Sequence, residues 1–165
     1  GRHSNVYIEK FRLMESPHYL DIVCKKMSQQ FNSNDIDIVL GAAIGGILLS
    51  SGVAKYLNKK GIFTERVEGR MELRRDFVIS DNANVLIVED IVSTGGSIFE
   101  LIEVVKSCNA NVAGITSIVH RSVEEIDFGH SYKPLLNHPV ESWDEDDIPE
   151  WLNEVPMTHR GRSGK

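Results

Sequence analysis

The stretch from residue 85 to residue 97, VLIVEDIVSTGGS, constrains the fold of this chain more than any other. Its first four residues, 85–88, are all apolar, which is typical of a strand buried on both faces of a parallel sheet. After Ser97, apolar residues recur at positions 98, 101, 102 and 105, the spacing of a helix with one buried face. The stretch therefore predicts a strand, a tight loop and a helix. In open α/β sheets, ligands bind at the carboxyl ends of such strands.

The loop between this strand and this helix has the composition of a phosphate site. Gly95 and Gly96 allow the backbone to approach a ligand closely, and successive N–H groups at a helix N-terminus attract anions. Ser93, Thr94 and Ser97 add hydroxyl donors that suit phosphate oxygens.

Two acids, Glu89 and Asp90, come just before the loop. Carboxylates beside an anion site are explained if they accept hydrogen bonds from sugar hydroxyls or lie near a developing cation. The combination indicates a sugar phosphate. A receiver-like or other doubly wound domain, whose strand merely ends in acids, is the alternative.

The order of these features resembles the binding motif for phosphoribosyl diphosphate (PRPP) in type I phosphoribosyltransferases, in the form found in orotate phosphoribosyltransferases. The resemblance implies that Glu89 and Asp90 hold the ribose 2- and 3-hydroxyls, and that Asp90 contributes to catalysis. It also implies that the loop holds the 5-phosphate through Ser93, Thr94, Gly95, Gly96 and Ser97.

A second small-residue turn follows the apolar run at residues 36–40 and precedes another helical pattern. It resembles the diphosphate loop of the same family, which implies that Ala43, Gly45 and Gly46 contact the leaving group. Some family members have a lysine where Gly45 stands, so here the backbone would have to bind the diphosphate. Tight packing between helix and strand would also select glycine.

Residues 61–79 are expected to form a strand, a short turn and a further strand. The pattern of arginines and phenylalanines there again resembles orotate phosphoribosyltransferases, and Arg66 is the best candidate for diphosphate contact and catalysis, because guanidinium groups pair with phosphate. Arg70, Arg74 and Arg75 are explained equally by a solvated hairpin. Many family members have a longer mobile loop here, with lysines and a histidine, and the short segment predicts a version that uses arginine instead.

The resemblance also places residues around the base. Arg121 follows the apolar strand predicted at residues 112–119, and with Ser93 it would bind the orotate carboxylate. Residues 1–10 are expected to form a polar turn that leads into a short alternating strand at 6–10, and the resemblance implies that Tyr7 and Ile8 lie against the pyrimidine and Lys10 near the site. A surface arginine and an ordinary core or edge-strand aromatic residue are the alternatives for Arg121 and Tyr7.

With 165 residues the chain is expected to form one domain, an α/β fold with a central parallel sheet flanked by helices. Residues 1–15 would begin a small hood that lines the base, and residues 139–165 would form a C-terminal extension. The net charge of −6 gives no reason to expect nucleic acid, and no membrane span is visible. Cys24 and Cys108 lack a partner spacing, which favours a reduced, cytoplasmic protein.

The resemblance implies an enzyme that transfers the phosphoribosyl group from PRPP to orotate, with Mg²⁺ on the diphosphate and no metal ligand from the protein itself. It also implies a homodimer. Transfer to another base and a PRPP-binding regulator without turnover are the two alternatives.

Overall fold

Six strands form one mixed sheet in the computed structural model, which describes residues 3–156. The strand order is β3-β2-β1-β4-β5-β6; every neighbouring pair is parallel except β2 with β3, which form an antiparallel hairpin at one edge. The predicted parallel sheet is therefore confirmed in its centre. The strands span Ile38–Ala42 (β1), Lys60–Val67 (β2), Arg70–Leu73 (β3), Asn84–Val92 (β4), Asn111–His120 (β5) and Tyr132–Asn137 (β6).

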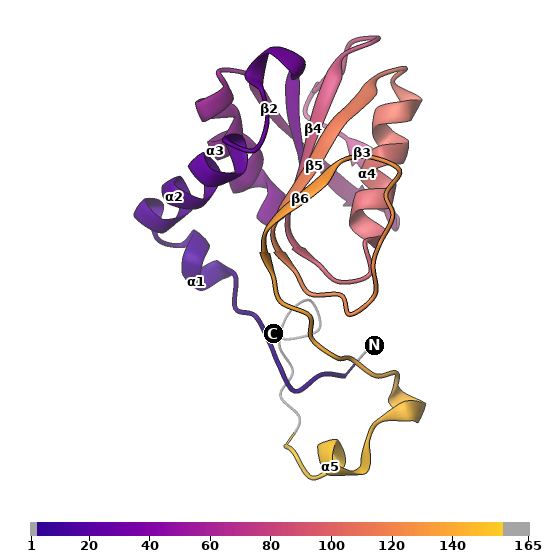
Figure 1. Cartoon of the computed structure of the whole chain (residues 1–165). Helices are drawn as coiled ribbons and strands as arrows, with labels where there is room; N and C mark the ends of the chain where they lie inside the picture. The colour runs from indigo at the N-terminus through magenta and orange to yellow at the C-terminus, as the bar shows by residue number, and fades with distance from the viewer. Residues whose placement is uncertain (1–2, 157–165) are drawn as a thin grey trace.

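Helices cover both faces of the sheet (Figure 1). Helices α2 (Pro17–Ser28) and α3 (Gly45–Leu57) lie on one face, and α4 (Gly96–Ser107) lies on the other. Every residue of β1 is buried, as is nearly all of β4, because these central strands are covered on both sides. Two apolar clusters result, one between the sheet and α4, the other between the sheet and α2–α3.

Strand β6 has no strong signal in the sequence. It contains Pro134, which removes a backbone donor, and most of its residues are only partly buried or exposed. Both features are acceptable because β6 pairs with β5 alone and forms the other edge of the sheet.

The expected strand at residues 6–10 is wrong. That segment is irregular up to the short helix α1 (Phe11–Met14), and His3 forms only an isolated bridge with Trp143. The backbone groups of His3 and Trp143 exchange hydrogen bonds of 2.7 and 2.8 Å, so the N-terminal segment pairs with the C-terminal segment instead of the sheet.

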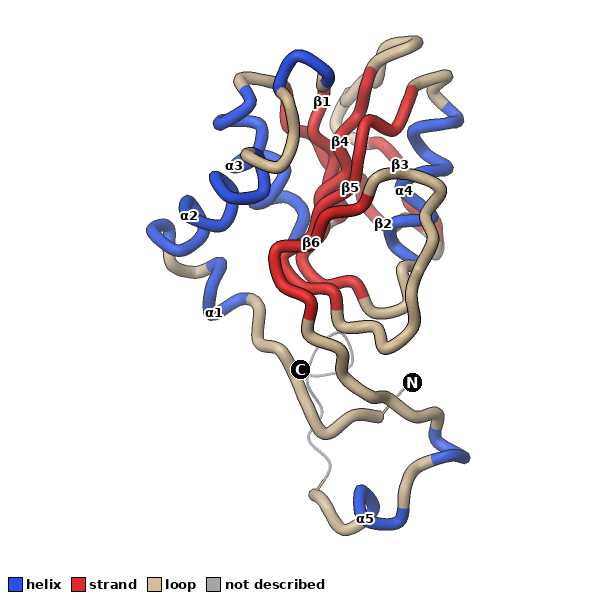
Figure 2. The backbone as a smooth tube through the Cα atoms, viewed as in Figure 1, coloured by secondary structure: helices blue, strands red, loops and turns tan. Residues whose placement is uncertain are grey.

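These two end segments make a small hood beside the carboxyl end of β6 (Figure 2). The C-terminal part includes the short helices η2 (Glu145–Asp147) and α5 (Glu150–Asn153), and Trp143 packs edge-on against Trp151. Residues 1–2 and 157–165 of the predicted hood and extension lie outside the described residues. Within residues 3–156, the helices are too short or too polar to cross a bilayer.

Candidate active site

The loops predicted to bind ligand follow strands that end at one edge of the sheet. β1 and β4 are parallel neighbours, and the turn at residues 43–44 and the loop at 93–95 follow directly. The backbone N–H of Arg121, just after β5, donates to the carbonyl of Val92, so Arg121 lies beside the residue that precedes Ser93. The structure thus brings together the three segments that the sequence singled out.

The loop at residues 93–97 ends in a helix N-terminus, as predicted. Ser93 and Thr94 are exposed, and Gly95 has a left-handed φ of 77° directly before α4. Gly95 at the N-cap has no side chain to cap this helix, and within residues 3–156 no side chain is found to accept from its first N–H groups. Exposed hydroxyls and uncapped amides form an arrangement that favours an anion.

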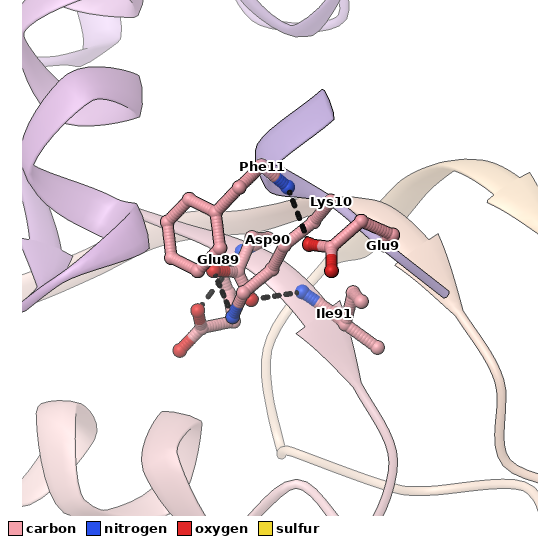
Figure 3. Close-up of polar contacts among 6 residues, drawn as sticks. All are labelled: Glu9, Lys10, Phe11, Glu89, Asp90 and Ile91. Carbon is pink, nitrogen blue, oxygen red and sulfur yellow. Dashed lines mark hydrogen bonds and ion pairs between the residues drawn. The ribbon is translucent and has the colours of Figure 1, made fainter. Parts of the chain in front are cut away.

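Glu89 and Asp90 point toward opposite faces of the sheet. Asp90 lies against Gly45 at the start of α3. Glu89 lies on the opposite face, because side chains two residues apart in a strand share a face, and Val85 and Ile87 belong to the apolar cluster beneath α4. Both are nearly buried, with exposed fractions of 7% for Glu89 and 4% for Asp90. One oxygen of Glu89 accepts from the N–H of Asp90 at 2.9 Å, and Asp90 Oδ1 accepts from the N–H of Ile91 at 2.6 Å (Figure 3).

Burial, and then the charge of Asp90, raise the pKa of Glu89 to about 8. Two adjacent carboxylates in a low-dielectric environment oppose ionisation of both. Burial and the neighbouring charge therefore both favour the protonated form of Glu89.

Lys10 supplies the cation that faces Asp90. Its Nζ lies 2.5 Å from Asp90 Oδ2, although the two residues are far apart in sequence (Figure 3). The structure therefore places Lys10 at the carboxyl end of β4. Tyr7, three residues earlier in the same irregular segment, is 44% exposed.

The turn before α3 brings backbone very close to backbone. A Cβ on Gly41 would lie 2.3 Å from the carbonyl oxygen of Gly46, so this position has no space for a side chain. The peptide bond from Ala43 to Ile44 is cis, and no side chain caps α3. Gly45 and Gly46 occupy the uncapped first turn, where their amides can serve an anion.

Arg66 does not contact these loops through any hydrogen bond or ion pair found in the described part of the chain. Its guanidinium donates to the carbonyl of Gly69 at 2.5 Å and to Glu100 of α4 at 2.7 Å. The ion pair between Arg66 and Glu100 connects the β2–β3 hairpin to α4, the helix that follows the loop at residues 93–95. Arg75 pairs with Glu65 through two nitrogens, which agrees with a structural role for this arginine in the hairpin.

The side chain of Arg121 faces the hood. One of its nitrogens donates to Ser4 Oγ at 3.3 Å, and Ser4 Oγ donates in turn to the carbonyl of Glu141. Burial lowers the pKa of Arg121 from its ordinary value, but a guanidinium remains charged in proteins. Within residues 3–156 this partly buried arginine has Ser4 as its one hydrogen-bonded side-chain partner, which leaves further donors for a planar anion.

The sequence does not indicate the residues that pack against the loop at residues 93–97. Phe128 packs against Gly95, and its ring also contacts those of Phe99 and Tyr132. The Tyr132 hydroxyl lies 2.7 Å from Ser117 Oγ, and burial raises the pKa of Tyr132 to about 12. Phe128 is in a polar loop with no periodic pattern, so the sequence contains no signal for this contact.

No group of three or more His, Cys, Asp and Glu side chains in residues 3–156 is arranged to hold a metal ion.

Comparison with known proteins agrees with this geometry. The family described as "Phosphoribosyl transferase domain" matches residues 12–159. An orotate phosphoribosyltransferase of Thermoanaerobacter sp. (strain X514) is 39% identical over 161 residues, covering 98% of this chain and 85% of the relative. The Thermotoga maritima (strain MSB8) orotate phosphoribosyltransferase is 38% identical over 164 residues, covering 99% and 88%.

Among solved structures, an adenine phosphoribosyltransferase from Thermoanaerobacter pseudethanolicus superposes with a TM-score of 0.67 at 15% identity. The match covers 77% of this chain and 85% of that one. At this identity the likeness concerns the fold alone.

Proposed function

We propose that this chain, which belongs to the phosphoribosyl transferase domain family and to its orotate phosphoribosyltransferases, transfers the phosphoribosyl group of PRPP to orotate. The products are orotidine 5-monophosphate, a precursor in pyrimidine synthesis, and diphosphate. The observation that carries the proposal is the N-terminus of α4, which follows the acids of β4 after a short loop, while Arg121 is hydrogen-bonded to Val92 at the end of β4.

The phosphate loop holds the 5-phosphate in this proposal. The hydroxyls of Thr94 and Ser97 donate to phosphate oxygens, the single hydroxyl donor of Ser93 is kept for orotate, and the glycines allow the amides of the first turn of α4 to approach. Glu89 and Asp90 are the candidates for the ribose hydroxyls. Asp90 is the stronger of the two, because burial and a raised pKa keep Glu89 neutral on the other face of the sheet.

The diphosphate lies over the turn before α3, where Ala43, Gly45 and Gly46 offer backbone rather than side chains. Arg66 reaches the diphosphate by exchanging its carboxylate partner, Glu100, for phosphate oxygens. A guanidinium pairs with either group through the same fork of donors, which makes such an exchange feasible.

Orotate lies between the hood and the end of β5. Its carboxylate pairs with Arg121 and with the hydroxyl of Ser93, while Tyr7 and Lys10 come from the hood segment. The hydrogen bond between Arg121 and Ser4 links base recognition to the hood, because the same Ser4 hydroxyl also bonds to the C-terminal segment.

The reaction forms a bond from the base nitrogen to C1 of the ribose and breaks the bond from C1 to the diphosphate oxygen, and the proton of that nitrogen goes to the departing diphosphate. Positive charge develops on the sugar, and the Asp90 carboxylate favours that charge, while Arg66 and the amides of the α3 turn favour the leaving diphosphate. Magnesium, when bound with the diphosphate, neutralises part of its charge.

We also infer a homodimer and a cytoplasmic location. Large apolar side chains remain exposed, among them Tyr19 at 58% and Trp151 at 49%, and a second subunit would cover part of this surface. Cys24 and Cys108 are both free, which suits a reducing compartment.

A base screen tests the proposal. The chain is incubated with PRPP and magnesium and with orotate, uracil or adenine, and release of diphosphate is measured. We expect release with orotate alone. Release with adenine or uracil instead would overturn the choice of base, and binding of PRPP without release for any base would identify a regulator rather than an enzyme.

A further inference from the structure

The carboxylate proposed to receive the ribose hydroxyls is covered by neighbouring groups of the protein. Only 5% of the Asp90 side chain is exposed, and each of its oxygens already has a partner (Figure 3). Oδ1 accepts from the N–H of Ile91, and Oδ2 accepts from Lys10 Nζ. Each oxygen could accept a second hydrogen bond, but with only 5% of the side chain exposed a sugar hydroxyl has little access to either oxygen in this arrangement.

The two sides of Oδ2 differ in how easily they can move. On one side lies the backbone of Gly45, so close that a Cβ there would be 1.8 Å from Oδ2. That backbone begins α3 and is buried, so it cannot withdraw without disturbing the helix. On the other side lies the Lys10 side chain, which is 28% exposed and carries its ammonium group on a flexible stem.

We propose that Lys10 is a latch on Asp90: it covers the carboxylate in the ligand-free protein and leaves it when the ribose hydroxyls bind. The inference rests on the proposed sugar-phosphate site and adds a control element to it. Lys10 belongs to the hood, so release of the latch connects filling of the sugar site with movement at the hood.

The latch has a measurable cost for sugar binding. A ligand that needs Asp90 binds only the fraction of molecules in which Lys10 has left, and its apparent affinity falls by that fraction. Once released, the ammonium group is a free cation beside the site, where it can attract the anionic groups of the substrates.

Ribose 5-phosphate is a suitable probe, because it has the hydroxyls and the 5-phosphate but neither a base nor a diphosphate. Its Kd is measured by calorimetry with the wild type, Lys10→Gln and Lys10→Arg. We expect Lys10→Gln to bind about three- to tenfold more tightly, since its competent fraction is larger. Lys10→Arg restores a cation opposite Asp90 and should bind about as the wild type does.

Two controls isolate the contact. Lys55→Gln breaks the ion pair of Lys55 with Asp21, 2.9 Å long and remote from this site, and should leave the Kd unchanged. In an Asp90→Asn background, Lys10→Gln should not lower the Kd for ribose 5-phosphate, because the carboxylate that pairs with Lys10 is absent.

If the wild type binds ribose 5-phosphate, the proposed sugar site is supported. If Lys10→Gln then binds it with unchanged or weaker affinity, the latch is overturned. Tightening that persists in the Asp90→Asn background would also overturn it. If neither the wild type nor Lys10→Gln binds ribose 5-phosphate, the sugar site itself is wrong and the latch with it.

Discussion

Phe128 lies so close to Gly95 that a Cβ on this glycine would come 2.8 Å from the ring carbon Cε1. Gly95 also has a φ of 77°, a conformation that costs other L-residues about 1–2 kcal/mol. The backbone conformation at residue 95 and the neighbouring ring of Phe128 therefore both require glycine at this position of the loop.

Gly95→Ala should lower stability by more than the backbone strain alone, about 2 kcal/mol or more, and should weaken PRPP binding at least about tenfold. The control is Gly129→Ala, which has a φ of 69° but nothing within 4 Å of the added Cβ. It should lose about 1 kcal/mol and keep its affinity for PRPP. Thermal melts and calorimetric titration measure both quantities, and equal effects in the two variants would remove the special role of Phe128.

Glu89 should make stability depend on pH. The pKa of its carboxyl in the folded protein is about 8, above the ordinary value of 4.5, so the unfolded chain releases this proton first. The folded state therefore loses stability at this residue as pH rises from about 4.5 to 8.

Glu89→Gln removes this cost and keeps an oxygen to accept the N–H of Asp90. Its stability relative to the wild type should grow between pH 5 and pH 8 by at least about 1 kcal/mol, or about 2–4 °C in Tm. Melts of the two proteins at matched pH values measure the difference. A difference that stays constant with pH would mean that Glu89 is ionised throughout.

Arg121→Ala should reduce kcat/KM for orotate and leave PRPP binding intact. Loss of one partner of a desolvated charge pair costs about 2–5 kcal/mol, which is roughly 30-fold to several-thousand-fold. Uracil, which has no carboxylate, should be a poor substrate and lose little more. Ser4→Ala removes the same hydrogen bond of Arg121 to the hood and is the matched control, expected to keep most of the orotate activity. Equal loss with orotate and uracil would contradict the assignment.

The proposed homodimer would cover some of the exposed apolar side chains. Light scattering at micromolar concentration should give twice the chain mass, because Tyr19, Ile22 and Trp151 would otherwise stay in water. A monomer with full activity would refute the dimer.

The centre of the fold could be predicted from the sequence because its signals are local. The apolar run at 85–88 and the spacing of Ile98, Leu101 and Val105 specify β4 and α4, and the structure has both. The same reasoning failed at residues 6–10, where alternation suggested a strand. The backbone of His3 instead pairs with Trp143, a contact between distant segments that no local pattern encodes.

The site was predicted in part for the same reason. Loops that follow strands can be placed from the sequence, since parallel strands end at one edge of the sheet. The pairs Lys10–Asp90 and Arg66–Glu100 join residues far apart in the chain, and composition gives no sign of which lysine or carboxylate will meet. Asp90 and Arg66, two of the proposed ligand-binding residues, are therefore each paired with another side chain of the protein. In the proposed function, the substrate replaces these partners.

Asp90→Asn tests the central claim most directly, because the other proposed roles depend on the proposal that this carboxylate binds the sugar. Steady-state turnover of PRPP with orotate is measured for this variant and the wild type, together with the Tm of each. We predict a fall in kcat/KM of at least about 100-fold, typical for loss of a group that stabilises charge in a transition state, with a Tm close to that of the wild type. Unchanged kinetics in a folded Asp90→Asn protein would contradict the account.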